Sequence, residues 1–351
     1  MTSIEQFCKA IAGFSVAGCA VRHRNTLQLL LREDYTQWTD WKEEGHYPAE
    51  TALEKRLVNV FLDDEDWGWA TLYNFDLSAI GAMTQPEQKA VVVSIDGGVY
   101  AIGSGSDGME TNLSELAGSP RVGFNRLKTI DGQLFACGGD RDLAQRLGVN
   151  RWRWFGEHFE RAPLDPSGIH EPVGFDDVDG FSVNDMYLVG GFGDVWHFDG
   201  KSARRIDFPS NLPLNAVCCG ADGQVYVGGY EGCLFVGRGD KWREIKGPRL
   251  SMPLMEMTWH DGKVWATNDF GVWWIDKNGI RQAELPVSVA ICAGHVSAND
   301  GVLMLAGLHG AAYQLDGRWT QIYSYADMIS KAKEAGQLDG VLRARWQEFR
   351  R

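Results

Sequence analysis

One turn motif recurs six times along the chain, at intervals close to 40 residues. Five copies are an Asp-Gly pair followed by an alternating run with a large apolar or aromatic residue, and the sixth lacks the glycine. Copies begin at residues 96, 131, 184, 222, 261 and 300, so successive starts lie 35, 53, 38, 39 and 39 residues apart. An Asx-Gly pair between apolar runs is the strongest short-range signal for a β-hairpin. The chain is therefore predicted to reverse direction at each copy, and an insertion around residues 150–171 explains the long interval.

The clearest copy spans residues 214–245 and predicts four strands. They are an apolar run at 214–219, an alternating strand at 224–228, a third strand at 233–237 after a glycine-rich bend, and a fourth at 241–245. Trp242 and Trp319 occupy the same place in the fourth strand, and Trp152 is a third candidate for it. Four antiparallel strands at this period are typical of one propeller blade.

The fold predicted is an all-β propeller with four-stranded antiparallel blades, most simply seven of them, with six as the alternative. Residues 14–31 and 56–74 read as strand pairs of an elaborated first blade at about 14–80. We expect one propeller domain over residues 1–324. The sequence leaves open which strands close the ring.

Both ends of the chain are predicted to be helical. Ser3 and Gln6 have the spacing of a capping box, which indicates a short helix over residues 3–12. Residues 325–351, interrupted at Gly336 and Gly340, predict a C-terminal helical tail.

Composition narrows the class of function. The 42 glycines against 11 prolines fit many tight turns, and the 14 tryptophans fit half-buried sheet surfaces. A net charge of −13 argues against nucleic-acid binding. It favours a partner protein with a basic surface, or it serves only solubility.

Targeting signals and disulfide patterns are lacking in the sequence. No apolar run is long enough to span a membrane, and no signal peptide is recognisable. The seven cysteines form no CxxC pair, which is typical of thiols in a reducing compartment. We expect a cytoplasmic monomer that binds neither membranes nor nucleic acid.

The stretch DGQVYVGGYEGCLFVGRGDKWREI resembles the repeat of the two-component-regulator type of propeller. Asp222, Gly223, Tyr226, Gly228 and Gly232 match that pattern, and a second copy matches at residues 261, 262, 265 and 271. The resemblance covers about residues 84–324 and implies architecture. In that family the propeller usually lies outside the cell, attached to a membrane span and a kinase. This sequence shows neither, so the sensor role does not carry over.

The bends between second and third strands are the candidate functional positions, since rigid sheets position variable loops on one face. We assign them to residues 103–108, 138–142, 190–194, 228–232, 267–271 and 306–310. Their non-glycine residues could grip a basic, partly apolar protein, with aromatics as anchors and acids for steering. Alternatively, they serve only the turns. The candidates are Asp107, Asp140, Arg141, Phe192, Asp194, Tyr230, Glu231, Asp269, Phe270 and His309.

Motifs that resemble catalytic signatures lack their context. GSGSDG matches a dinucleotide fingerprint but belongs to a hairpin repeat, and Asp269-Phe270-Gly271 has no accompanying kinase segments. The histidines show no metal-ligand spacing, although His260 and His295 fall near the ends of innermost strands. The acidic clusters at residues 63–66 and 176–179 are interpreted as exposed turns. We predict no catalytic residue, metal site or cofactor.

Two hypotheses of function remain. The first is a non-catalytic, protein-binding propeller, such as an immunity protein that neutralises a cognate bacterial toxin. The second is a hydrolase or lyase that acts on a glycan or small ligand at the channel mouth, which requires convergent acids or histidines with perturbed pKa values.

Overall fold

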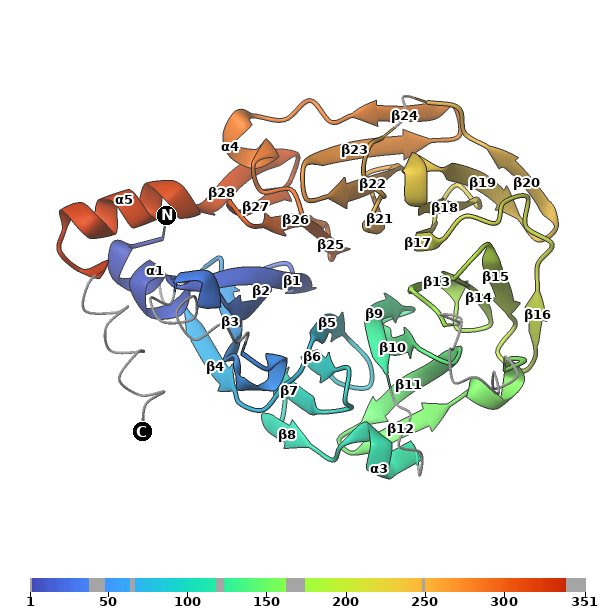
Figure 1. Cartoon of the computed structure of the whole chain (residues 1–351), viewed down its shortest axis with the longest axis horizontal. Coiled ribbons are helices and arrows are strands. Elements are labelled where there is room, and N and C mark those ends of the chain that lie inside the picture. Colours follow the sequence, from blue (N-terminus) through green and yellow to red (C-terminus); the bar gives the residue numbers. More distant parts are fainter. Residues whose placement is uncertain are drawn as a thin grey trace. The chain divides into compact units, whose positions relative to one another are not determined.

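Seven four-stranded antiparallel sheets make up the fold, each from strands consecutive in the sequence (Figure 1). The computed structural model describes residues 2–37, 48–63, 67–117, 123–161, 174–247 and 250–338. The predicted all-β propeller with seven blades is confirmed, and the alternative of six blades is wrong. Trp152, Trp242 and Trp319 lie on fourth strands, as predicted.

The first three blades are β1 (Phe14–His23), β2 (Thr26–Glu33), β3 (Lys55–Phe61) and β4 (Gly68–Leu72); β5 (Ser78–Met83), β6 (Lys89–Ser94), β7 (Val99–Gly103) and β8 (Gly108–Glu110); and β9 (Phe124–Ile130), β10 (Gln133–Gly138), β11 (Asp142–Gly148) and β12 (Arg151–Trp154). The next two are β13 (Asp177–Ser182), β14 (Asp185–Gly190), β15 (Asp194–Phe198) and β16 (Ala203–Arg205); and β17 (Leu214–Cys219), β18 (Val225–Gly229), β19 (Leu234–Arg238) and β20 (Lys241–Glu244). The last two are β21 (Glu256–His260), β22 (Lys263–Asn268), β23 (Gly271–Asp276) and β24 (Gly279–Gln282); and β25 (His295–Asn299), β26 (Val302–Gly307), β27 (Gly310–Leu315) and β28 (Arg318–Ser324).

Short helices accompany the sheets. They are α1 (Ile4–Ala10), α3 (Leu113–Ala117), α4 (Val287–Ala290) and α5 (Tyr325–Glu334), with 3-10 turns η1 (Tyr35–Gln37), η2 (Glu50–Ala52), η3 (Gly156–His158) and η4 (Tyr230–Gly232). Within the described residues, no helix has the length and apolar character needed to cross a membrane.

The chain divides into two compact units. Unit 1 comprises Met1–Leu77 and Leu285–Arg351, and it holds the first and seventh blades with α1 and α5. Unit 2 comprises Ser78–Glu284 and holds the second to sixth blades.

In unit 1, strands from the two ends of the chain pack against each other. All four strands of the seventh blade come from the C-terminal segment, and β1 of the first blade packs against β25 and β26. The Val21 N–H donates to Ser297 Oγ at 3.0 Å, and Asn299 Nδ2 donates to the Val21 carbonyl at 3.2 Å. The first and last blades therefore meet through hydrogen bonds between side chains and backbone, and no strand from the described N-terminal residues belongs to the last blade.

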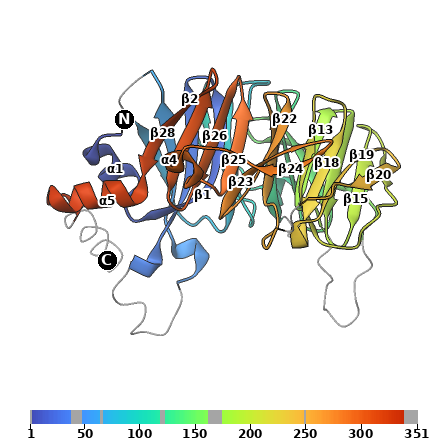
Figure 2. The same cartoon turned by 90° about the horizontal axis from the view of Figure 1, so that it is seen from above.

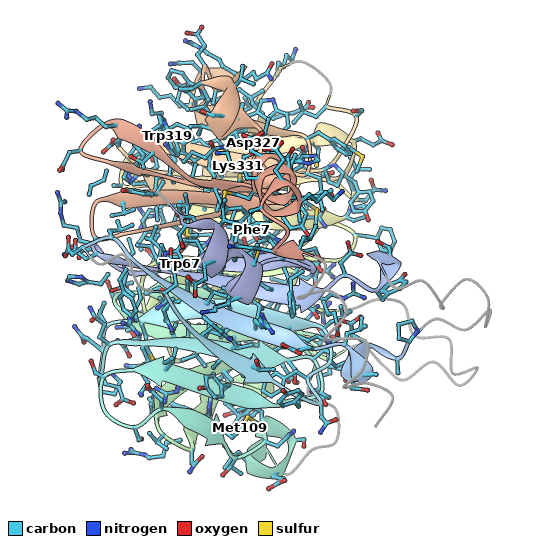
Figure 3. All side chains as sticks on the ribbon, turned by 90° about the vertical axis from the view of Figure 1, so that its left-hand side faces the viewer. Phe7, Trp67, Met109, Trp319, Asp327 and Lys331 are labelled. Atoms are coloured by element: carbon cyan, nitrogen blue, oxygen red, sulfur yellow. The ribbon has the colours of Figure 1, made fainter. Side chains whose placement is uncertain are left out.

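The N-terminal helix covers the core of unit 1. Ser3 Oγ accepts from the Gln6 N–H at 3.1 Å and Gln6 Oε1 accepts from the Ser3 N–H at 3.2 Å, which confirms the predicted capping box. Phe7 is fully buried, with ring centroids 6.0 Å from Tyr323 and 5.5 Å from Tyr325. Figure 2 shows α1 beside α5, and Figure 3 labels Phe7 in the same part of the fold.

Unit 2 is built by packing the first strands of successive blades side by side, in the order β5, β9, β13, β17 and β21 (Figure 1). Apolar residues of one blade pack against those of the next. The cluster of Met83, Val91, Leu127 and Leu134, for example, joins the second blade to the third. We call the line of first strands the inner edge of unit 2.

The first copy of the repeat is one strand out of register with the others. Asp96-Gly97 joins β6 to β7, the second and third strands, whereas Asp131-Gly132 joins β9 to β10, the first and second. The turn between β5 and β6 is residues 84–88, TQPEQ, which has no Asx-Gly pair. Residues 103–108 consequently join β7 to β8, so their assignment to a bend between second and third strands is wrong.

The prediction that residues 176–179 form an exposed turn is also wrong, because residues 177–179 belong to β13, a strand of the inner edge. Asp177 and Asp179 lie on β13 and are buried. Asp177 Oδ2 accepts from the Val217 N–H and Asp179 Oδ2 from the Cys219 N–H, each at 2.9 Å. These carboxylates tie β13 to β17 and are not an exposed turn. In the other cluster Asp63 lies in an exposed turn, and residues 64–66 lie outside the described part of the chain.

A glycine ends the second strand in four blades, and the chain entering that blade passes directly over it. A Cβ there would collide with a carbonyl oxygen of the incoming segment, as at Gly229 with Pro213. In the sixth blade the equivalent residue is Asn268, whose Oδ1 accepts from the Phe270 N–H at 2.9 Å. The repeated Gly-Gly pairs thus mark close backbone packing. The four glycines are Gly138, Gly190, Gly229 and Gly307.

Replacing this contact glycine should destabilise the fold. We expect Gly229→Ala to lower the free energy of unfolding by roughly 1–3 kcal/mol, because the added methyl group meets backbone that cannot move freely. Gly279→Ala is the matched control, since an added Cβ would meet no atom within 4 Å apart from its chain neighbours. It should change the free energy of unfolding by no more than about 0.5 kcal/mol. Urea denaturation measures both. Equal stability of the two variants would contradict the packing described.

Candidate functional site

Three aromatic side chains lie at the bends between second and third strands of consecutive blades in unit 2. Phe192 follows β14, Tyr230 follows β18 and Phe270 follows β22. Their exposed fractions are 59%, 48% and 79%. Large aromatic side chains are usually buried, so their exposure at equivalent corners of three blades needs a reason beyond packing.

The segments that connect the blades join these bends into one surface. The connection after β16 lies between two of them: Phe192 and Pro213 form an isolated antiparallel bridge, and the Tyr230 N–H donates to the Pro213 carbonyl at 3.0 Å. The connection after β20 packs against the bend that carries Tyr230, because a Cβ on Gly232 would meet Leu250 at 2.8 Å. It then reaches the sixth blade, where the Met255 N–H donates to the Thr267 carbonyl at 2.8 Å.

Two methionines on that second connection extend the apolar surface. Met252 and Met255 are 40% and 42% exposed. Sequence reasoning missed them because it looked only at bends between strands. The available signal is the segment LSMPLMEM, which places three methionines within six residues between two predicted strands. We call Phe192, Tyr230, Met252, Met255 and Phe270 together the apolar belt.

Acidic residues border the apolar belt. Glu231 and Asp269 are both exposed, and neither makes an ion pair with the residues that the structure describes. Glu231 has a φ of 56°, in the left-handed region that residues other than Gly, Asn and Asp rarely adopt. Asp140, half-buried in the bend of the third blade, shares this conformation with a φ of 55°.

Arg141 and Asp194, two other predicted contact residues, are buried and bound to each other. Arg141 Nε lies 2.7 Å from Asp194 Oδ2, and the Trp196 indole N–H donates to Asp194 Oδ1 at 3.0 Å. The Arg141 guanidinium also stacks 5.1 Å from the Trp196 ring centroid. The pair therefore fastens the third blade's bend onto the fourth blade.

The remaining two predicted residues lie elsewhere. Asp107 belongs to the turn between β7 and β8, where its Oδ1 accepts from the Gly103 N–H at 2.7 Å. By strand direction this turn lies at the opposite end of its blade from the second-to-third bends. His309 lies in unit 1, in the turn between β26 and β27, beside Leu308, which is 65% exposed.

Paired charges line the inner edge of unit 2. Arg126 on β9 donates to Glu256 Oε1 at 2.7 Å and to the Met255 carbonyl at 2.9 Å, and its Nε lies 3.7 Å from Asp177 Oδ1. Burial alone would lower the pKa of Arg126, but Glu256 and Asp177 raise it above its ordinary value. The guanidinium is thus a permanent cation that holds the connection carrying Met255 in place.

Lys128 continues this network one step along β9. Its Nζ donates to the Met257 carbonyl at 2.8 Å and lies 3.9 Å from Asp177 Oδ2. Burial would lower the pKa of Lys128, but Asp177 and Asp179 raise it overall. Burial raises the pKa of Asp179 despite the nearby lysine.

The cysteines and histidines, which could act as nucleophiles, bases or metal ligands, are dispersed over the described residues. All seven cysteines are free thiols, and six of them are buried. His260 ends β21, with Nε2 3.4 Å from Asp261 Oδ2, and His295 begins β25 in unit 1. Among the described residues, no three His, Cys, Asp or Glu side chains are grouped to hold a metal ion.

One relative in sequence identifies the family of the chain, and solved structures identify its fold. No family model matches the chain. Over 281 residues, 77% of this chain and 89% of the relative, the sequence is 31% identical to the "Immune protein Tsi7" of Pseudomonas aeruginosa. The chain belongs to the family of this immune protein. The predicted immunity protein is thereby confirmed.

Two solved structures are similar to the chain. The WD40 β-propeller domain of Doa1 matches with a TM-score of 0.56 at 10% identity, over 84% of this chain and 90% of that one. This likeness shows the propeller fold alone. A gluconolactonase from Xanthomonas campestris matches with a TM-score of 0.43 at 15% identity, over 66% of this chain and 82% of that one, which is too distant to bear on chemistry.

The bend of the third blade should make stability depend on pH through Asp142. Burial raises the pKa of this carboxyl to about 6, although Arg161 at 3.1 Å opposes the shift. Because this pKa lies above the unfolded value of 3.8, the folded state binds more protons between the two values. The contribution of Asp142 to stability therefore falls as pH rises from about 4 to 6.

Asp142→Asn cannot titrate and serves as the reference. We expect the free energy of unfolding of the wild type, relative to this variant, to drop on the order of 2 kcal/mol between pH 4 and pH 7. Urea titrations at several pH values measure it. Parallel pH profiles of the two proteins would show that the carboxyl has an ordinary pKa.

Proposed function

We propose that the chain protects its cell by binding a toxin protein directly and blocking it, without catalysis, as a cytoplasmic monomer. The relationship to an immune protein over most of the chain is the observation that carries this proposal. The exposed aromatic corners of unit 2 support it, because such residues supply the anchors of protein interfaces.

The proposed contact surface consists of part of the loop face that was predicted from the sequence. Exposure favours Phe192, Tyr230, Glu231, Asp269 and Phe270, and half-exposure admits Asp140. Arg141 and Asp194 hold the surface from beneath. Asp107 and His309 also stay proposed contacts. Asp107 lies in the turn between β7 and β8, and His309 belongs to unit 1. A basic toxin surface fits the chain's net charge of −13.

The alternative of a glycan- or ligand-processing enzyme would need acids or bases free to act at the inner edge. The cations described there, Arg126 and Lys128, are bound to carboxylates and backbone carbonyls. We therefore propose a binding role. We also propose that the repeat is of the two-component-regulator type, on the residues given above.

Stoichiometry distinguishes a binder from an enzyme. The purified chain should abolish the activity of the toxin encoded beside its gene in a linear titration that ends at one chain per toxin molecule. Co-expression should likewise restore growth to cells that make the toxin. Inactivation complete far below equimolar chain would show catalysis, and absence of any inhibition would refute the immunity role.

A further inference from the structure

We propose that the apolar belt docks a partner protein that presents an apolar patch bordered by basic residues. This inference rests on the proposed function and identifies where and how unit 2 makes the contact. It differs from the loop face predicted by sequence, because it is centred on three blades and includes a connection between blades.

The exposed apolar side chains of unit 2 are concentrated in the apolar belt. Among the described residues of unit 2, eight large apolar side chains are exposed, and five of them form the apolar belt. The backbone contacts at Pro213, Leu250 and Thr267 place these five on a continuous run of bends and connections. Exposed large apolar side chains that gather along one run of bends and connections are typical of an interaction site.

The types of side chain in the apolar belt suit a protein interface. Phe192, Tyr230 and Phe270 offer rigid apolar area at low conformational cost, which suits interface anchors. Met252 and Met255 are flexible and polarizable, so they can adapt to the shape of a partner. The combination fits an apolar protein surface better than a charged one.

Negative charges lie beside the aromatic residues of the apolar belt. Glu231 adjoins Tyr230 and Asp269 adjoins Phe270, so each carboxylate stands at the edge of an anchor. Lys246, at the outer end of the second connection, is an exposed cation in the same region. With the chain at −13 overall, the field favours a basic border on the partner, which speeds association.

Hydrogen bonds hold the backbone of the apolar belt in place before binding. Arg126 fixes the Met255 carbonyl from below, and the Met255 N–H is held by Thr267 on β22. Asn268, the next residue on that strand, holds the Phe270 N–H. A surface fixed in this way loses little conformational entropy when a partner docks.

Paired variants at two exposed apolar positions test the proposal. Phe270→Asp introduces a charge into the belt, and Met109→Asp introduces the same charge on β8 of the second blade, where Met109 is 62% exposed. The probe is the toxin encoded beside the gene, inactivated at its active site, and calorimetry measures its Kd. We expect Phe270→Asp to raise the Kd at least 100-fold and Met109→Asp to change it less than about threefold.

A second variant tests the basic border. Glu231→Arg with Asp269→Arg should slow association at least tenfold at low salt and remove most of its salt dependence, as measured by stopped-flow fluorescence. Unfolding curves of all variants establish that each is folded.

The outcomes separate the two proposals. If the wild type does not bind the toxin, the proposed function fails and the docking surface falls with it. If the wild type binds and Phe270→Asp binds equally well, the docking surface is overturned while the function stands. Association that charge reversal leaves unchanged overturns the basic border. A wild-type dimer that Phe270→Asp converts to monomers would assign the belt to a second copy of this chain and overturn the proposal.

Discussion

The contact between each incoming connection and the end of a second strand determines how the loop surface is built. At Gly138, Gly190, Gly229 and Gly307 the backbone of the incoming segment lies where a side chain would otherwise project. This closeness requires glycine and leaves little room for movement. As a consequence, the connection and the bend form one packed corner, and the residue at its tip is directed outward.

Buried charges hold the blades of unit 2 together along its inner edge. Asp177 and Asp179 bind backbone N–H groups of the neighbouring blade, and Arg126 holds the entry into the sixth blade. Removing one partner from such a network leaves another charge buried without compensation, which commonly costs about 3–5 kcal/mol. The apolar belt is therefore carried by a rigid frame of glycine contacts and paired ions, although its own side chains contribute little to that frame.

Periodicity allowed much of the fold to be predicted, because hairpin turns have local sequence rules. The six copies of the turn motif located six blades, the strand pairs at residues 14–31 and 56–74 supplied the first blade, and the spacing of Ser3 and Gln6 predicted the first helix. The same rule misplaced the first copy, since Asp96-Gly97 turns between different strands and TQPEQ carries no turn pair. Asp177 looked like part of a solvated turn because its partners, the N–H of Val217 and Arg126, lie far away in the sequence.

The candidate surface was half predictable for the same reason. Phe192, Tyr230 and Phe270 occupy repeated turn positions, so their exposure follows from the repeat, whereas Met252 and Met255 lie in a connection without a repeated pattern. Arg141 and Asp194 looked equivalent to the exposed residues, but they are partners from two different blades.

Hydrogen–deuterium exchange of the chain with and without its toxin tests the central claim most directly, because it needs no substitution. We predict slowed exchange on toxin binding in residues 190–194, 228–232, 250–256 and 267–271. We predict unchanged exchange at the turns between first and second strands of the same blades, such as Asp222-Gly223 and Asp261-Gly262. Protection confined to those turns, or to the outer fourth strands, would contradict the claim that the chain binds its toxin through this surface.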